Sequence, residues 1–250
     1  MSDVLLRVEN LAKHFGGIRA TDDLSLDVRS GELHALIGPN GAGKTTLISQ
    51  LIGEMQPDSG TIRMNGIVIN TLSTPQRVAR GLARTFQITE LLREETALAN
   101  VALAIQARQG HSFRFFADAR RERDLLDPAM AILRNAGLEH RARIHVAALS
   151  HGEHKQLELA IALATEPKLL LLDEPMAGLG AVESQDMTMI LKALKGRITM
   201  LLVEHDMQAV FALADRISVL VYGQVIATGT SAEIQANTDV RTAYLGEGNS

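Results

Sequence analysis

The chain has 250 residues, 46% of them hydrophobic, which is enough for one large domain or two small ones around a packed core. A formal net charge of −4 argues against the basic surface that nucleic-acid binding needs, and the lack of cysteine excludes disulfides and thiol chemistry. No apolar run is long enough to span a membrane, and the first residues lack the regions of a signal peptide. We therefore expect a cytoplasmic protein that can still dock onto a membrane protein.

The start of the chain has the pattern of an antiparallel sheet. Short apolar stretches at 4–8 and 24–28 indicate strands, and the second of them alternates apolar and polar residues. Residues 61–64 and 67–69 flank Asn65-Gly66, a dipeptide that favours a two-residue hairpin turn. We predict that these strands form an antiparallel subdomain beside the rest of the fold.

A phosphate-binding loop follows the apolar run 33–37, which has the pattern of a buried strand, and a helix is expected after it. The loop fits G-x-x-x-x-G-K-[ST] and consists of Gly38, Pro39, Asn40, Gly41, Ala42, Gly43, Lys44, Thr45 and Thr46. Glycines let the backbone wrap around phosphate oxygens, and the helix N-terminus points free N–H groups at the anion. Lys44 would reach the β- and γ-phosphates and Thr45 would bind Mg²⁺. A simple glycine-rich turn would not need the strand and helix on either side.

Helical patterns at 96–106 and 128–136 dominate the middle of the chain. The charged segment 111–124 between them contains three aromatic residues, which either pack between helices or form a docking surface: Phe113, Phe115 and Phe116. Ser150 and Glu153 have the S-x-x-E spacing of a capping box that starts another helix. We predict one domain, with residues 1–89 and 159–250 forming the nucleotide-binding core and residues 90–158 an inserted α-helical subdomain.

Apolar strand patterns return at 169–172, 200–203 and 217–222, separated by helical patterns. This alternation predicts an α/β fold with a mostly parallel sheet. Asp173 and Glu174 directly follow the first of these strands, at the end where nucleotides bind in such sheets. Asp173 would bind Mg²⁺, directly or through water, and Glu174 would orient or deprotonate an attacking water.

Taken in order, these motifs resemble the ATP-binding subunit of an ABC transporter over nearly the whole chain. The resemblance implies an ATPase with ATP and Mg²⁺ at its site. It implies further roles for five residues: Phe15 stacks on adenine, Gln87 contacts Mg²⁺ or water and senses the transmembrane partner, His205 contacts the γ-phosphate, and Ser150 and Gly152 face the γ-phosphate held by a second ATP-binding subunit. On residue type alone, Phe15 could be a core residue, Gln87 a surface amide and His205 a loop residue beside the helix cap Asp206.

The chain departs from the family pattern at two places. The signature usually written L-S-G-G-Q here has His151 and Glu153, and the loop that usually carries an aspartate has Gly180. His151 keeps its backbone N–H, so the substitution need not abolish phosphate binding by the signature, although it removes the conformational freedom of glycine. The role of the loop at Gly180 stays open.

The signature variant and the surroundings of Glu174 and His205 resemble the group that imports branched-chain or other hydrophobic amino acids. This resemblance implies two membrane-spanning permease subunits, a second ATP-binding subunit that is the same or different, and indirectly a substrate-binding protein. The chain would then lie peripherally on the cytoplasmic face of the cell membrane.

Two alternatives remain, and a third is disfavoured. The ATPase of a lipopolysaccharide exporter has a similar pattern but is expected to keep glycine at position 151. The length of the chain is also compatible with a soluble ABC ATPase of a cofactor-assembly complex. A P-loop GTPase would need an N-K-x-D motif, which the sequence lacks. Neither the transported molecule nor the choice between homodimer and heterodimer follows from the sequence.

Overall fold

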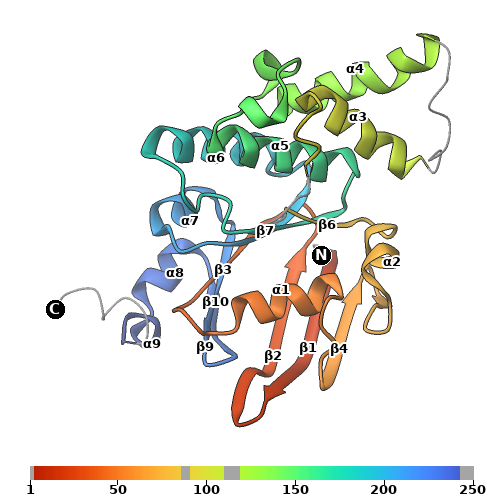
Figure 1. Cartoon of the computed structure of the whole chain (residues 1–250). Helices are drawn as coiled ribbons and strands as arrows, with labels where there is room; N and C mark the ends of the chain where they lie inside the picture. The colour runs from red at the N-terminus through yellow and green to blue at the C-terminus, as the bar shows by residue number, and fades with distance from the viewer. Residues whose placement is uncertain (1–2, 86–90, 110–118, 243–250) are drawn as a thin grey trace. The chain divides into compact units, whose positions relative to one another are not determined.

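The computed structural model (Figure 1) describes residues 3–85, 91–109 and 119–242. The chain falls into two compact units. Unit 1 consists of Met1–Leu82, Lys168–Glu174 and Leu194–Ser250, and unit 2 consists of Ala83–Pro167 and Pro175–Ala193. The boundaries predicted at 89/90 and 158/159 stay a prediction.

Unit 1 begins with a four-stranded antiparallel sheet in the order β2-β1-β4-β5. The strands are β1 (Val4–Phe15), β2 (Ile18–Arg29), β4 (Ser59–Met64) and β5 (Ile67–Val68). Asn65 and Gly66 both have positive φ, at 49° and 77°, which is the conformation that a tight hairpin turn between right-twisted strands needs. The predicted antiparallel subdomain is therefore confirmed, although β1 and β2 are longer than their apolar stretches indicated.

The second sheet has six strands in the order β10-β9-β3-β8-β7-β6. They are β3 (Leu33–Ile37), β6 (Leu82–Arg84), β7 (Leu169–Asp173), β8 (Thr199–Val203), β9 (Arg216–Val221) and β10 (Gln224–Gly229). β7, β8, β3 and β9 pair in parallel, and β10 is antiparallel to β9. The central strands β3, β7 and β8 are buried at every position, as expected for strands covered on both faces. The mostly parallel sheet is confirmed.

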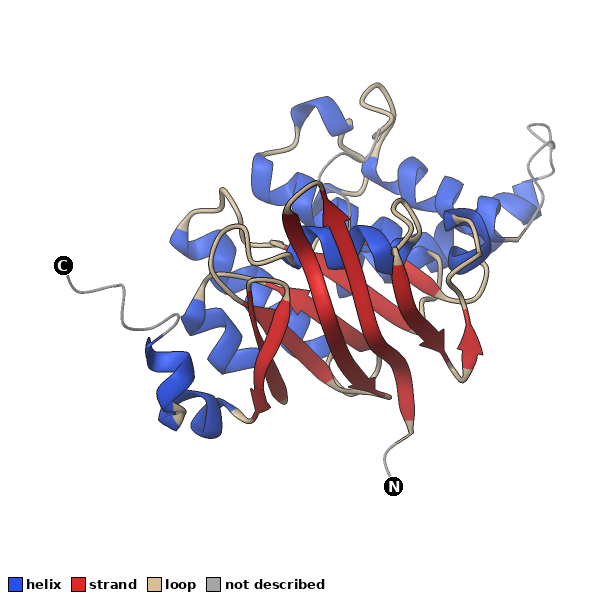
Figure 2. Cartoon of the chain, turned by 90° about the horizontal axis from the view of Figure 1, so that it is seen from below, coloured by secondary structure: helices blue, strands red, loops and turns tan. Residues whose placement is uncertain are grey.

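Helix α1 (Lys44–Ile52) supplies the core between the two sheets of unit 1, whose strands are red in Figure 2. Its buried Leu47 and Leu51 belong to one apolar cluster with Leu24 of β2 and Leu201 of β8. A short helix, α2 (Thr74–Val78), follows β5. The opposite face of the parallel sheet carries a second cluster, to which three helices contribute: α7 (Met207–Leu213), α8 (Ser231–Ala236) and α9 (Thr238–Val240).

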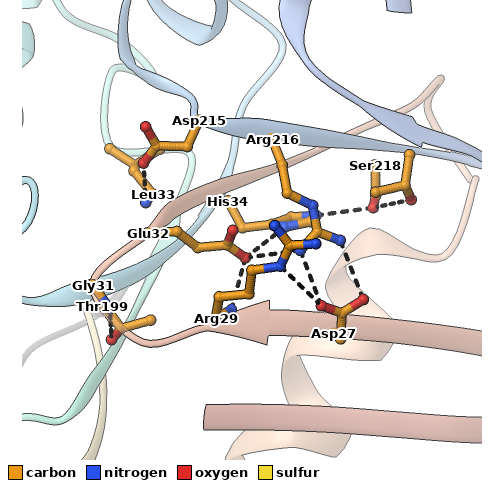
Figure 3. Close-up of polar contacts among 11 residues, drawn as sticks. Asp27, Arg29, Gly31, Glu32, Leu33, His34, Thr199, Asp215, Arg216 and Ser218 are labelled. Carbon is orange, nitrogen blue, oxygen red and sulfur yellow. Dashed lines mark hydrogen bonds and ion pairs between the residues drawn. The ribbon is translucent and has the colours of Figure 1, made fainter. Parts of the chain in front are cut away.

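A buried polar network fastens the beginning of β3 to its neighbours in unit 1 (Figure 3). His34 is fully buried, with Nδ1 3.1 Å from the Glu32 carboxylate and Nε2 2.9 Å from the Ser218 hydroxyl. Arg216 of β9 donates to both carboxylate oxygens of Asp27 on β2 and also contacts Glu32 at 3.5 Å. The strand that leads into the phosphate-binding loop is thus tied to both sheets.

Unit 2 is helical in its described part, apart from the end of β6. It contains α3 (Ala97–Arg108), α4 (Ala119–Asn135), α5 (His151–Ala164), α6 (Ala181–Leu194) and two 3₁₀ turns, Glu139–Arg141 and Val146–Ala148. Alanine and aliphatic side chains of α3, α4 and α5 form its core. The predicted α-helical part is confirmed. However, α4 begins at Ala119 and keeps Pro128 inside it, whereas the sequence suggested a start at Pro128, where proline is usually tolerated. The three phenylalanines at 113, 115 and 116 lie outside the described residues.

Candidate functional site

The phosphate-binding loop joins the buried end of β3 to the first residue of α1, as predicted. The Lys44 side chain is only 7% exposed, and its Nζ donates to the carbonyl oxygens of Gly38 at 2.6 Å and Pro39 at 3.0 Å. Burial lowers the pKa of Lys44, and the nearby charges of Glu174 and Asp173 partly oppose this effect. A buried lysine held across the loop in this way is a cation ready to receive phosphate oxygens.

Two neighbouring segments of unit 1 hold the loop in its folded shape. Gly43 has φ +106°, and a Cβ there would lie 2.0 Å from the Ala20 carbonyl oxygen of β2. The backbone N–H of Gly223, in the β9–β10 hairpin, donates to the Ala42 carbonyl oxygen at 2.9 Å. Because the loop packs backbone against backbone, no side chain fits at Gly43. This close packing explains why the loop pattern has glycine at this position.

Two carboxylates follow β7, at the carboxyl end of the parallel sheet. Asp173 is 6% exposed, while the Glu174 side chain is 35% exposed. Glu174 has a left-handed backbone, with φ +48°, and its N–H donates to the Val203 carbonyl oxygen of β8 at 2.9 Å. Such a conformation is unusual for a residue other than glycine and is typical of functional sites. It turns the carboxylate of Glu174 out of the strand register that buries Asp173.

His205 follows β8 and lies next to this acidic pair. Its Nδ1 is 3.9 Å from Glu174 Oε1 and 3.8 Å from Glu204 Oε2, and its side chain is 62% exposed. The carboxylate of Asp206 accepts hydrogen bonds from the N–H groups of Gln208 and Ala209 and so caps α7. The cap fixes the chain just after His205, so the histidine and Glu174 lie close together at the ends of adjacent strands.

Phe15 lies at the end of β1, opposite Ile18 across the hairpin, and is 48% exposed. The ammonium of Lys13 lies 5.8 Å from the centre of its ring. An aromatic ring left this exposed is available to stack on a flat ligand. Gln87 lies outside the described residues.

The signature residues lie in unit 2, at the N-terminus of α5. Ser150 is the N-cap: its hydroxyl accepts the Glu153 N–H at 3.2 Å, and the Glu153 carboxylate accepts the Ser150 N–H at 2.8 Å. The predicted capping box is confirmed. Arg141 forms an ion pair with Glu153 at 2.8 Å, and Gly152 is buried in the first turn. The N-terminus of a 14-residue helix is a suitable place for an anion.

The residues of unit 1 fit a magnesium ion only together with a phosphate ligand. Thr45 offers a hydroxyl in the first turn of α1, where it is exposed, and Asp173 offers a carboxylate. Within the described residues, no group of three or more His, Asp or Glu side chains could hold a metal by itself. Mg²⁺ favours this kind of arrangement, with one or two protein oxygens and the remaining ligands from water and nucleotide phosphates.

Residues 21–177 match the family model described as ABC transporter, and residues 224–249 match one described as branched-chain amino acid ATP-binding cassette transporter. The chain belongs to the ABC transporter family of ATP-binding cassettes. It is 39% identical to the high-affinity branched-chain amino acid transport ATP-binding protein LivG of Salmonella typhimurium, over 99% of this chain and all of that protein. It is 34% identical to the lipopolysaccharide export system ATP-binding protein LptB of Escherichia coli, over 97% of each chain.

A solved ATP-binding cassette in its ADP conformation has the same fold, with a TM-score of 0.84 and 30% identity over 97% of this chain and 99% of that one. The cassette described here is therefore a nucleotide-binding ATPase. Among its described residues, no helix has the length and apolarity to cross a membrane.

Two residues that the sequence interpretation missed support the cassette's site. Glu204 is 1% exposed and accepts the N–H groups of His205 at 3.0 Å and Asp206 at 3.3 Å. Its position directly after an apolar strand was a usable signal. Arg77 is fully buried and donates to the carbonyl oxygens of Gln50 and Leu51, each at 2.6 Å, in the last turn of α1. No local sequence pattern predicts this contact.

Proposed function

We propose that the cassette binds ATP on the loop Gly38–Thr46 and hydrolyses it to power the import of branched-chain or other hydrophobic amino acids. The observation that carries the ATPase part is that β3 and β7 flank β8 in unit 1, with Leu36 and Asp173 both opposite Val203, so the loop with Lys44 and the two carboxylates leave the same end of the sheet. A cation for the phosphates and two carboxylates for metal and water are the parts that phosphoryl transfer to water needs.

Each residue has one task in this proposal. Lys44 and the backbone N–H groups of the loop bind the β- and γ-phosphates, and Phe15 stacks on adenine. Glu174 orients the attacking water and accepts its proton, with His205 beside it. Thr45 and Asp173 would hold Mg²⁺, which supplies charge compensation on the phosphates when bound. Gln87, outside the described residues, would contact the metal or water. Most of the rate enhancement comes from positioning and charge stabilisation.

A second ATP-binding subunit completes the site. At the N-terminus of α5, Ser150 offers its hydroxyl and Gly152 its N–H group to an anion, and the proposal assigns both to the γ-phosphate of a nucleotide on that partner. The partner is either a second copy of this chain or a different cassette. Closure of the pair around two nucleotides and its opening after hydrolysis would drive transport.

The partners and the substrate are proposed from the relatives. Residues 224–249 resemble branched-chain amino acid cassettes, and the higher identity is to a relative named for branched-chain amino acid transport rather than to one named for lipopolysaccharide export. The cassette would bind two membrane-spanning permease subunits at the cytoplasmic face of the cell membrane, with a substrate-binding protein joining them indirectly.

The first test is Glu174→Gln. The amide keeps the shape of the carboxylate and removes its capacity to accept a proton, so we expect ATP binding within about threefold of wild type and hydrolysis at least about a hundredfold slower. Near-normal turnover would reject the assignment of Glu174.

The matched test of binding is Lys44→Ala. Removing the buried cation should weaken ATP binding at least about tenfold, because charge-assisted contacts to phosphate are lost. Binding is measured by equilibrium titration with a fluorescent ATP analogue. Unchanged affinity would contradict the assignment of the loop.

A further inference from the structure

Within unit 2, the N-terminus of α5 and the loop before α6 contact each other through two glycines. His151, the first residue of α5, lies over Gly178: a Cβ on Gly178 would be 3.1 Å from His151 Nε2. Glu183, in the first turn of α6, lies against Gly152: a Cβ on Gly152 would be 2.6 Å from Glu183 Oε1. Each segment therefore places a side chain against a glycine of the other.

The Glu183 carboxylate is also held from the side of the loop. Its Oε2 accepts the Gly180 N–H at 3.1 Å, while Oε1 faces Gly152. One carboxylate thus spans the end of the loop and the first turn of α5. A side chain at position 152 would push this carboxylate away and release the Gly180 N–H.

The contact of His151 likewise requires a glycine at position 178. Gly178 has φ +78°, a conformation that residues with a Cβ rarely adopt. The imidazole lies where that Cβ would point. A larger residue at position 178 would therefore be strained by its backbone and would also meet the imidazole.

The two contacts involve His151 and Gly152, which directly follow Ser150 at the helix end that would face an anion with the Ser150 hydroxyl and the Gly152 N–H. The capping box with Glu153 already fixes Ser150 to its own helix. The contacts of His151 and Glu183 add a connection from that helix end to the loop. Phosphate binding by N–H groups depends on their orientation, and a misplacement of about 1 Å can cost a hundredfold in rate.

We propose that His151 and Glu183 are positioning residues that hold loop 176–180 and the N-terminus of α5 together as one body. Ser150 and Gly152 then meet the phosphate on the second subunit in a fixed orientation. The inference rests on the proposed function, in which that phosphate belongs to ATP on a partner cassette.

The test compares His151→Gly, Glu183→Ala and Glu183→Gln in the intact transporter assembly. We expect the two truncations to lower kcat about tenfold while ATP binding to the loop Gly38–Thr46 stays within twofold of wild type. Glu183→Gln keeps an acceptor for the Gly180 N–H and should restore most of kcat. The matched controls are His140→Gly and Asp186→Asn, which line the same 430 Å³ cavity as Gly152 and Glu183 and should leave kcat unchanged.

A double-mutant cycle separates a direct contact from general damage. Gly178→Ala should lower kcat more in the presence of His151 than in the His151→Gly background, where the space above position 178 is free. Additive effects, or equal losses in the control variants, would overturn the proposal.

Amide hydrogen exchange on the purified cassette tests the contact between the two segments without relying on ATP hydrolysis, so it tests this inference independently of the proposed function. Glu183→Ala should speed exchange in residues 150–153 and 176–180 together. Faster exchange in only one of these segments would contradict the proposal that they are held together, even if the variant still hydrolyses ATP. Wild-type hydrolysis that does not depend on a second cassette would reject the proposed site shared by two cassettes. If both segments still exchange together in that case, the contact made by His151 and Glu183 is nevertheless supported.

Discussion

At the scale of single residues, the geometry of Glu174 and His205 explains how a strand end becomes a reactive position. Glu174 is held in a left-handed conformation by its hydrogen bond to β8, and this strain, on the order of 1 kcal/mol, aims the carboxylate toward His205 rather than into the sheet. Buried Glu204 fixes the backbone of His205 from below. The imidazole is thus placed by its backbone and stays largely exposed to an incoming ligand.

We predict that His205→Ala lowers kcat of the cassette about a hundredfold and leaves ATP affinity within threefold, because the imidazole supports the water that Glu174 orients. The measurement is steady-state ATP hydrolysis alongside equilibrium nucleotide binding. His14→Ala is a suitable control, since His14 is a half-exposed histidine of unit 1 whose Nδ1 lies 3.5 Å from Asp58 Oδ2, in a contact outside the proposed machinery. Equal kinetics for the two alanine variants would exclude a specific role for His205.

At this scale the sequence was most informative. The loop Gly38–Thr46, Asp173 and the capping box of Ser150 could be predicted, because each depends on neighbours within a few positions of the chain. Arg77 could not be assigned, because its role comes from burial and from carbonyl oxygens far away in the sequence. Glu204 was missed although its position directly after an apolar strand was a usable signal. The positions of Phe15 and His205 are now known, but their contacts with a nucleotide stay predictions.

At the scale of elements, the C-terminus of α1 shows what holds the nucleotide-binding helix in place. The last carbonyl groups of a helix lack partners within it, and here the Arg77 guanidinium supplies donors to Gln50 and Leu51. Its other nitrogens donate to Leu72 at 3.0 Å and Asn70 at 2.9 Å. A single buried side chain therefore connects α1 to the segment that enters α2.

We predict that Arg77→Leu destabilises the cassette by about 3 kcal/mol, because it leaves several buried carbonyl oxygens without donors. Arg77→Lys should recover part of the loss, since an ammonium donates to fewer of them. Chemical denaturation with the midpoint and slope fitted together measures the effect. Arg80→Leu is the control, because Arg80 lies on the same segment, is exposed, and its side chain donates to the Gln76 carbonyl oxygen at 3.3 Å. Indistinguishable midpoints for Arg77→Leu and Arg80→Leu would contradict the capping role.

The network at the start of β3 predicts how stability responds to acid. The hydrogen bond from Arg216 lowers the pKa of Asp27, and for Glu32 the contacts with His34 and the Arg29 N–H outweigh the opposite effect of burial. A carboxylate whose pKa is depressed in the folded state contributes stability above its unfolded pKa, about 4 for these residues, and loses it as pH falls through the folded value.

We therefore predict that the melting temperature is level near neutral pH and falls as pH drops below about 4, where the carboxylates take up protons. Asp27→Asn should lower stability by about 1 kcal/mol at pH 7, a value that allows for the partial exposure of the pair, and should flatten the acid-induced loss. Calorimetry between pH 7 and pH 3 measures both effects. Asp3→Asn, an exposed change in the same unit, should leave the curve unaltered. An Asp27→Asn curve as steep as that of wild type would show that the pair does not contribute.

At the scale of the whole molecule, the sequence predicted the classes of structure well because they follow from the period of the apolar residues. Alternating residues at 24–28, continuous apolar runs in the central strands and helical spacing in the middle of the chain each indicated the part that is observed. Element ends were less predictable: α4 extends back to Ala119 because packing in the core of unit 2 outweighs the usual restriction on Pro128. Which residues group into each unit depends on contacts between distant segments, which no local pattern reveals.

The last prediction concerns the assembly that the whole molecule joins. A tagged Glu174→Gln chain, solubilised with detergent from native membranes, should recover two polytopic membrane proteins and an ATP-binding partner, because slow hydrolysis favours the closed pair of cassettes. Uptake of labelled leucine should fall when the chain is deleted and return with the wild-type chain but not with Lys44→Ala. Recovery of lipopolysaccharide-export components would favour that alternative. Recovery only with soluble proteins would overturn the transport role and leave the ATPase chemistry in place, because Lys44, Asp173 and Glu174 all lie within unit 1.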